Sequence, residues 1–125
     1  MSNKIKVAIL DDHQSIVDGY SYRLAGSPLI EVVGTLCYGA EIEPFLASRP
    51  VDVMILDVNV PTSQENSNLY PILHLIPNLL ERYPNLVILV ISMHNQRTLV
   101  QAVIDAGASG YILKDDRESI QQLAN

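Results

Sequence analysis

The sequence has 125 residues, of which 48% are hydrophobic and 18% are charged, and its formal net charge is −6 at pH 7. This length corresponds to one domain, residues 1–125, with a core large enough to fold without a disulfide or a structural metal. The acidic balance disfavours binding to nucleic-acid phosphates, and no apolar run approaches the roughly 18 residues of a membrane span. The single cysteine, Cys37, cannot form an internal disulfide, which fits a reducing cytoplasm. We therefore expect a cytoplasmic domain that binds neither a membrane nor, by itself, DNA.

Five apolar runs rich in β-branched residues recur along the chain. They cover residues 5–10, 30–36, 51–56, 86–91 and 110–113. Continuous apolar runs of this length, without alternating polar residues, are typical of parallel strands that are covered on both faces of a sheet.

Segments with helical spacing lie between these runs. Their apolar stripes cover residues 16–24, 42–47, 69–83 and 99–104. Pro44 restricts the second segment to a helix whose first turn contains the proline, and Pro77 is expected to kink or split the third. Asp115 and Glu118 resemble a capping box that opens a short last helix. Five strands alternating with five helices predict a doubly wound α/β fold with a five-stranded parallel sheet.

Polar residues with compatible chemistry stand where four of the strands end. They are Asp11 and Asp12, Asp57, Ser92, and Lys114. Ligands in doubly wound folds bind beyond the carboxyl ends of the strands, so these side chains should converge. Three close carboxylates repel one another unless a cation such as Mg²⁺ lies between them. The pattern predicts that one of these carboxylates accepts a phosphoryl group, with Ser92 and Lys114 contacting the oxygens of that group.

Each of these residues also has an ordinary structural explanation. The two adjacent aspartates could stabilise the positive N-terminus of the following helix, and Asp57 could be a loop residue. Ser92 suits any turn after a strand, and Lys114 could be a solvated surface charge. The three histidines, His13 among them, do not have the sequence spacing of zinc ligands, either with one another or with Cys37, so no zinc site is expected. Cys37 is expected to pack as a small apolar side chain. Only the joint pattern at four strand ends favours the phosphoryl site.

Four segments together resemble the receiver domain of two-component response regulators, over essentially the whole chain. They are VAILDDH (7–13), VMILDVNVP (53–61), VISMH (90–94) and AGASGYILKD (106–115). The Asp-Asp-His start, Ser-Met-His, and Gly-Tyr-Ile-Leu-Lys-Asp are similar to the LuxR/NarL branch in particular. The resemblance implies a flavodoxin-like, CheY-like fold. Members of that branch usually carry a C-terminal helix-turn-helix DNA-binding domain, which is expected to be absent from these 125 residues.

The resemblance also implies a role for each candidate residue. Asp57 would be the phosphoacceptor, assisted by Lys114 and Ser92, and Ser92 and Tyr111 would form a conformational switch. Tyr111 could equally be an ordinary core residue. The implied Mg²⁺ ligands are Asp12, Asp57 and the backbone carbonyl of Asn59, with Asp11 acting through a water molecule.

The function implied by the resemblance is signalling, with no separate enzymatic activity. A sensor histidine kinase would donate a phosphoryl group to Asp57 in a Mg²⁺-dependent reaction. The resulting conformational switch would control an output, such as transcription through the DNA-binding domain, and could produce a homodimer.

Two departures from the family pattern leave an alternative open. Glu65 stands where the family usually has glycine, within a polar segment 62–68 that looks several residues longer than normal, and Met93 could narrow access to Asp57. A degenerate receiver that acts as a phosphorylation-independent interaction module would tolerate such changes. A flavin-binding or phosphatase domain would share the fold, but no glycine-rich phosphate loop follows the first apolar run.

Overall fold

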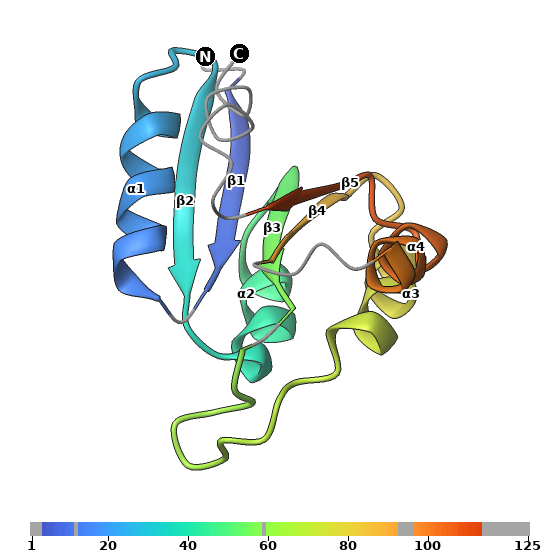
Figure 1. Ribbon diagram of the computed structural model, residues 1–125. Helices are drawn as coiled ribbons and strands as arrows, with labels where there is room; N and C mark the ends of the chain where they lie inside the picture. Colours follow the sequence, from blue (N-terminus) through green and yellow to red (C-terminus); the bar gives the residue numbers. More distant parts are fainter. Residues whose placement is uncertain (1–3, 12, 59, 93–96, 114–125) are drawn as a thin grey trace.

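In the computed structural model, five parallel strands form one sheet in the order β2-β1-β3-β4-β5 (Figure 1). The structure describes residues 4–11, 13–58, 60–92 and 97–113. The strands are β1 (Ile5–Leu10), β2 (Ile30–Leu36), β3 (Val53–Asp57), β4 (Val87–Ser92) and β5 (Gly110–Leu113). The predicted doubly wound sheet is confirmed, with β3 and β4 each starting and ending one or two residues later than expected.

Helices cover both faces of the sheet because successive strand residues point to opposite faces. On one face, Ile9 and Ile55 pack with Tyr20 of α1 (Gln14–Ala25). On the other face, Ala8 and Met54 join a larger cluster with the remaining helices. Those helices are α2 (Ile42–Ser48), preceded by the short 3₁₀ helix η1 (Gly39–Glu41), α3 (Ile72–Arg82) and α4 (Arg97–Asp105).

The sequence made specific predictions about the two helix prolines and about a last helix. Pro44 lies in the first turn of α2, as predicted. Pro77 does not split α3, which runs without interruption from Ile72 to Arg82. The predicted short fifth helix, opened by Asp115 and Glu118, lies outside the described residues. In the described part of the chain, no helix is long and apolar enough to cross a bilayer.

Two residues differ from their predicted environments. Leu69 was expected on the apolar stripe of the third helix, but it precedes α3 and its side chain is 63% exposed. It pairs with Pro61 in an antiparallel bridge, so the chain is still extended there, and α3 begins only after Pro71. Cys37, expected to be packed, is exposed because it follows Leu36, the last and buried residue of β2.

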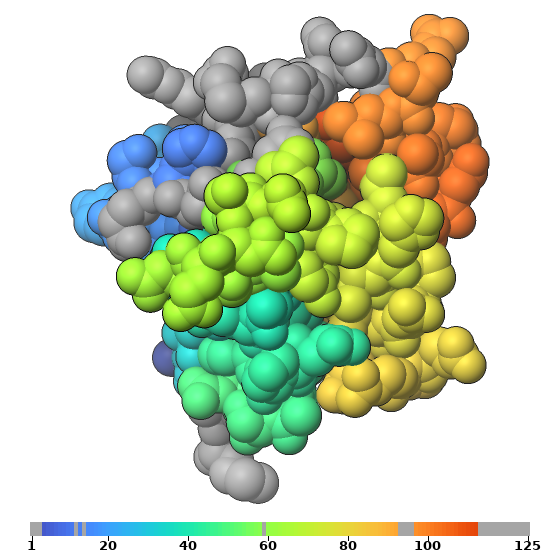
Figure 2. Space-filling view, turned by 90° about the horizontal axis from the view of Figure 1, so that it is seen from below, coloured from blue at the N-terminus to red at the C-terminus, as the bar shows by residue number. Residues whose placement is uncertain are grey.

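Backbone hydrogen bonds hold the two ends of the long polar segment between β3 and α3 together. The backbone N–H of Thr62 donates to the carbonyl of Asn68 at 2.9 Å. Backbone N–H groups of Gly39 and Ala40 donate to the carbonyls of Pro61 and Thr62. A side chain at Gly39 would overlap the ring of Tyr70, which explains the glycine. Figure 2 shows this segment, in yellow-green, on the surface beside α2 (teal) and α3 (yellow).

Candidate functional site

The buried polar side chains gather at the carboxyl edge of the sheet. Among the described residues, the buried polar or charged side chains are Asp11 (0% exposed), Asp57 (1%) and Ser92 (0%). Asp11 directly follows β1, Asp57 is the last residue of β3, and Ser92 is the last residue of β4. Burial of a charged group is costly unless something compensates for it, so this edge is the place to look for chemistry.

Strand pairing explains why the two aspartates meet. Leu10 of β1 is in register with Leu56 of β3, so Asp11 and Asp57 each stand one position beyond a paired residue. The strand order also reverses direction here, because β2 lies on one side of β1 and β3 lies on the other. Such a switch point is where open α/β sheets bind their ligands.

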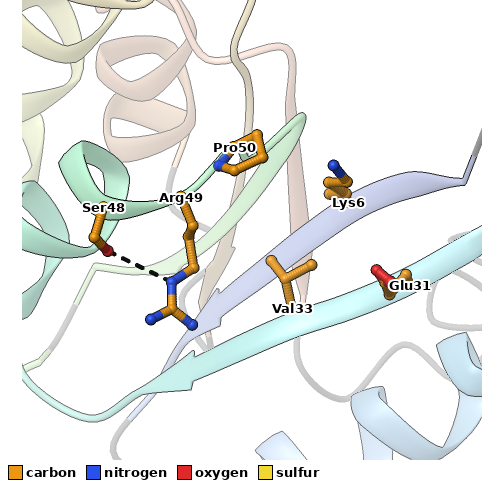
Figure 3. Close-up of a pocket in the computed structure, with 6 residues that line it drawn as sticks. All are labelled: Lys6, Glu31, Val33, Ser48, Arg49 and Pro50. Carbon is orange, nitrogen blue, oxygen red and sulfur yellow. Dashed lines mark hydrogen bonds between the residues drawn. The ribbon is translucent and has the colours of Figure 1, made fainter.

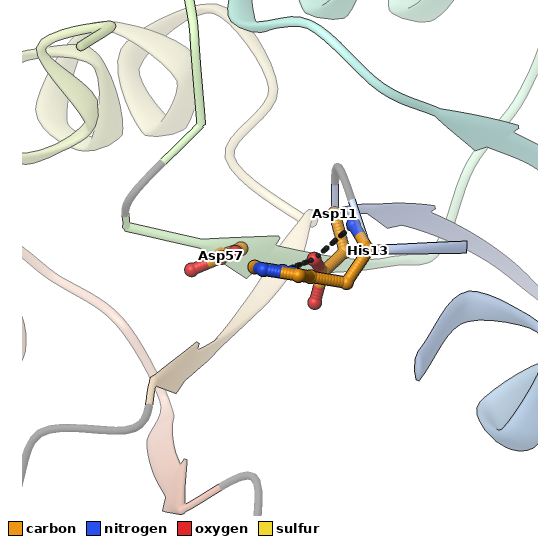
Figure 4. Close-up of side chains that lie close together, drawn as sticks. All are labelled: Asp11, His13 and Asp57. Atoms are coloured by element: carbon orange, nitrogen blue, oxygen red, sulfur yellow. Dashed lines mark hydrogen bonds and ion pairs between the residues drawn. The ribbon is translucent and has the colours of Figure 1, made fainter. Parts of the chain in front are cut away.

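His13 completes a small cluster with these carboxylates (Figure 4). Its backbone N–H donates to Oδ1 of Asp11 at 2.9 Å, and its Nδ1 lies 3.0 Å from the same oxygen. One potential ligand atom from each of Asp11, His13 and Asp57 lies within 4.8 Å of the others. The sequence interpretation missed His13 because it compared the histidines only with one another and with cysteine. The signal was an Asp-x-His spacing directly after an apolar run.

Tyr20 is a second neighbour that the sequence did not single out. Its side chain is 1% exposed, on the apolar stripe of α1. Burial, followed by the charges of Asp11 and Asp57, raises the pKa of its phenol to about 12. The two carboxylates therefore create a negative potential that extends into the core beneath them. An amphipathic pattern places a tyrosine on a buried face, but it does not reveal which charges its hydroxyl will face.

The site residues expected from the sequence fall into two groups. The structure brings Asp11, Asp57 and Ser92 to one edge, with Ser92 on the strand next to Asp57. Tyr111 lies on β5, paired with Val90, and is partly buried against the cluster on the α3 and α4 side of the sheet. The other predicted site residues, Asp12, Asn59, Met93 and Lys114, lie outside the described residues.

The donor set of the described residues suits a hard cation. Carboxylate oxygens are the ligands that Mg²⁺ prefers, together with carbonyls and retained water molecules. Two buried carboxylates whose charges reach as far as Tyr20 provide the negative potential that such an ion would neutralise. His13 adds an imidazole at the exposed side of the same cluster, with 56% of its side chain accessible. The residues present therefore fit a divalent cation.

Comparison with known proteins identifies the family. Residues 7–125 match the response regulator receiver domain. The chain belongs to this family. Over 113 residues it is 34% identical to the transcriptional regulatory protein DegU from Brevibacillus brevis, which covers 90% of this chain and 45% of that protein. The chain spans about half the length of the curated relatives it matches. Receivers of two-component regulators in the LuxR/NarL branch are thus its relatives, as the sequence motifs predicted.

Solved receiver structures share the fold. The receiver domain of the response regulator NarL from Mycobacterium tuberculosis superposes with a TM-score of 0.82 and 24% identity, covering 97% of this chain and 93% of that one. The non-phosphorylated receiver domain of the stress response regulator RcsB from Escherichia coli gives a TM-score of 0.80 at 26% identity, covering 97% and 88%. The predicted CheY-like architecture is therefore confirmed.

Proposed function

We propose that this receiver accepts a phosphoryl group on Asp57 from the phosphohistidine of a sensor histidine kinase. A carboxylate oxygen of Asp57 would form the new bond to phosphorus as the bond from phosphorus to the histidine nitrogen breaks. The observation that carries the proposal is the burial of the Asp57 carboxylate beside Asp11, at the switch point of the sheet. A chain that used these aspartates only to start a helix would have no reason to hold both of them out of water.

The proposed reaction depends on Mg²⁺. We assign Asp12, Asp57 and the backbone carbonyl of Asn59 as its ligands, with Asp11 acting through a water molecule. When bound, the ion would neutralise both the carboxylates and the oxygens of the incoming group. The backbone N–H and the ring of His13 hold one oxygen of Asp11, which fixes the orientation of that carboxylate before the ion arrives.

Lys114 and Ser92 complete the proposed phosphoryl site. The ammonium of Lys114 would neutralise phosphoryl oxygens as a point charge, and the hydroxyl of Ser92 would donate to one of them. Ser92 is buried on the strand beside Asp57, which supports this assignment. Tyr111, partly buried on the adjacent strand, would then change its rotamer as the second element of the switch.

The proposal also covers the output of this receiver and its partners. The relatives described as transcriptional regulators are about twice as long as this chain. We propose that the switch controls transcription through a helix-turn-helix domain outside these 125 residues, that phosphorylation favours a homodimer, and that the protein works in the cytoplasm with its kinase.

The intact mass of the protein after incubation with acetyl phosphate and Mg²⁺ tests the proposal. The wild type should gain one phosphoryl group, and Asp57→Ala should gain none. Asp52→Ala is the matched control, because Asp52 is an exposed aspartate that precedes the same strand at its other end. It should be phosphorylated like the wild type. A wild type that gains no mass would favour the degenerate receiver, which acts by binding alone.

A further inference from the structure

The hydroxyl of Tyr20 has no hydrogen-bond partner among the described residues. The side chain is 1% exposed and belongs to an apolar cluster on the α1 face of the sheet. The other buried members of this cluster are Val7, Ile9, Val17, Leu24, Ile55 and Ile91. A buried hydroxyl without a partner destabilises the folded state, and native proteins contain few of them. Phenylalanine would fill the same space without this cost, so the oxygen needs an explanation.

The position of Tyr20 directs its hydroxyl toward the functional edge. Long side chains on a helix point back toward the N-terminus of that helix, and α1 begins at Gln14, just after Asp11 and His13. Tyr20 packs on Ile9 and Ile55, which precede Asp11 and Asp57 by two residues. The charges of both aspartates also act on the phenol, together with its burial, to raise its pKa. The ring therefore lies beneath the two carboxylates.

Asp11 offers the better acceptor of the two. Both hydrogen bonds from His13 are made to its Oδ1, whereas its Oδ2 is a buried atom that receives neither of them. Asp57, in contrast, needs its oxygens for the cation and for the phosphoryl group in the proposed function. The Tyr20 hydroxyl makes no direct bond to either carboxylate, so a single bridging water molecule is the simplest connection.

We propose that Tyr20 is a positioning residue of the Mg²⁺ site, whose hydroxyl donates through one buried water molecule to Oδ2 of Asp11. With His13 holding Oδ1, the carboxylate is then fixed at both oxygens. Groups that orient metal ligands in this way raise affinity because the ligand does not have to reorganise when the ion binds. The inference rests on the metal site of the proposed function and adds to it a residue from the apolar face of α1.

Mg²⁺ affinity of the full chain tests this role, measured by isothermal titration calorimetry. Tyr20→Phe removes only the oxygen, and we expect its dissociation constant for Mg²⁺ to rise roughly 10-fold, the lower end of the effect of losing a group that orients a metal ligand. Its melting temperature without Mg²⁺ should change little, because phenylalanine fills the same space and only one water-mediated hydrogen bond is lost. Tyr22→Phe makes the same chemical change on the same helix at a side chain that is 84% exposed, and it should bind Mg²⁺ like the wild type.

A second variant separates the hydroxyl from the packing around it. Val17→Ala creates a small cavity in the same apolar cluster, so it should lower the melting temperature while Mg²⁺ affinity stays the same. Equal Mg²⁺ affinities of Tyr20→Phe and wild type would overturn the role of Tyr20 alone. That role would also be overturned if Val17→Ala weakened binding as much as Tyr20→Phe. A wild type that binds no Mg²⁺ would instead overturn the metal site and the inference together.

Discussion

Charged residues are exposed to water at one end of the sheet and buried at the other. At the amino end, a shallow hollow is lined by charged side chains such as Lys6, Glu31 and Arg49 (Figure 3). Arg49 lies over the ring of Phe45 at 4.5 Å and donates weakly to Ser48. These side chains remain near water, and the contacts of Arg49 are local.

The carboxyl end holds its charges out of water. Asp11 and Asp57 are fully buried, and the structure places them next to each other although they carry the same charge. Folding alone gives no reason to keep this arrangement, since apolar residues of similar size would serve stability as well or better. The charged side chains at the amino end thus remain at the surface, whereas the two buried carboxylates at the carboxyl end are the ones that we propose to bind a cation.

The largest expected effect comes from replacing the carboxylate of Asp57 at the carboxyl end of the sheet. Asp57→Asn should weaken Mg²⁺ binding by at least about tenfold and should abolish the rise in melting temperature that Mg²⁺ causes. Without Mg²⁺, the same variant should be more stable than the wild type, because a buried repulsion is removed.

Asp52→Asn supplies the comparison for this effect. The exposed Asp52 accepts a hydrogen bond from the backbone N–H of Lys6 at 2.8 Å, and an amide oxygen can still accept it. Mg²⁺ should therefore stabilise this variant as it does the wild type, as a thermal denaturation series against Mg²⁺ concentration would reveal. If both variants lost the response equally, the two ends of the sheet would not differ in the way proposed.

A smaller effect is expected at high pH. The pKa of Tyr20 is raised to about 12 in the folded protein, from an ordinary value of 10. The folded state thus favours the protonated phenol, and this contribution to stability is fully present below pH 10. It is lost as the pH rises from 10 to 12, because the unfolded chain ionises first.

Urea denaturation across this window measures the contribution. The wild type should lose more stability between pH 10 and 12 than Tyr20→Phe, which has no phenol to ionise at that position. Tyr22→Phe should follow the wild type, because Tyr22 is exposed. Parallel pH profiles for wild type and Tyr20→Phe would show that the carboxylates and the burial do not act on Tyr20 as described.

The smallest effect is expected at the amino end. Arg49→Ala removes the contact with Phe45 and a long hydrogen bond to Ser48, and its cost should be below about 1 kcal/mol. Its Mg²⁺ affinity, measured by the same titration, should equal that of the wild type. A large loss of stability or of Mg²⁺ binding would mean that this end also contributes to function.

The fold was predictable because its signals are local. Each apolar run marked a strand to within two residues, and the polar residues after the first, third and fourth runs marked the edge where Asp11, Asp57 and Ser92 lie. Leu69 was misplaced because helical spacing continues into the extended chain before Pro71. The proximity of Tyr20 to the aspartates could not be predicted, since it depends on the angle at which α1 lies on the sheet.

The polar segment between β3 and α3 is a suitable place to insert a label. Its ends are held by backbone hydrogen bonds, between Thr62 and Asn68 within the segment and from η1 to Pro61 and Thr62. Residues 64–67 project into solvent beyond these anchors. A short peptide tag or a fluorophore inserted there should be carried at a fixed place on the surface without disturbing Asp57, because exposed loop tips tolerate insertion.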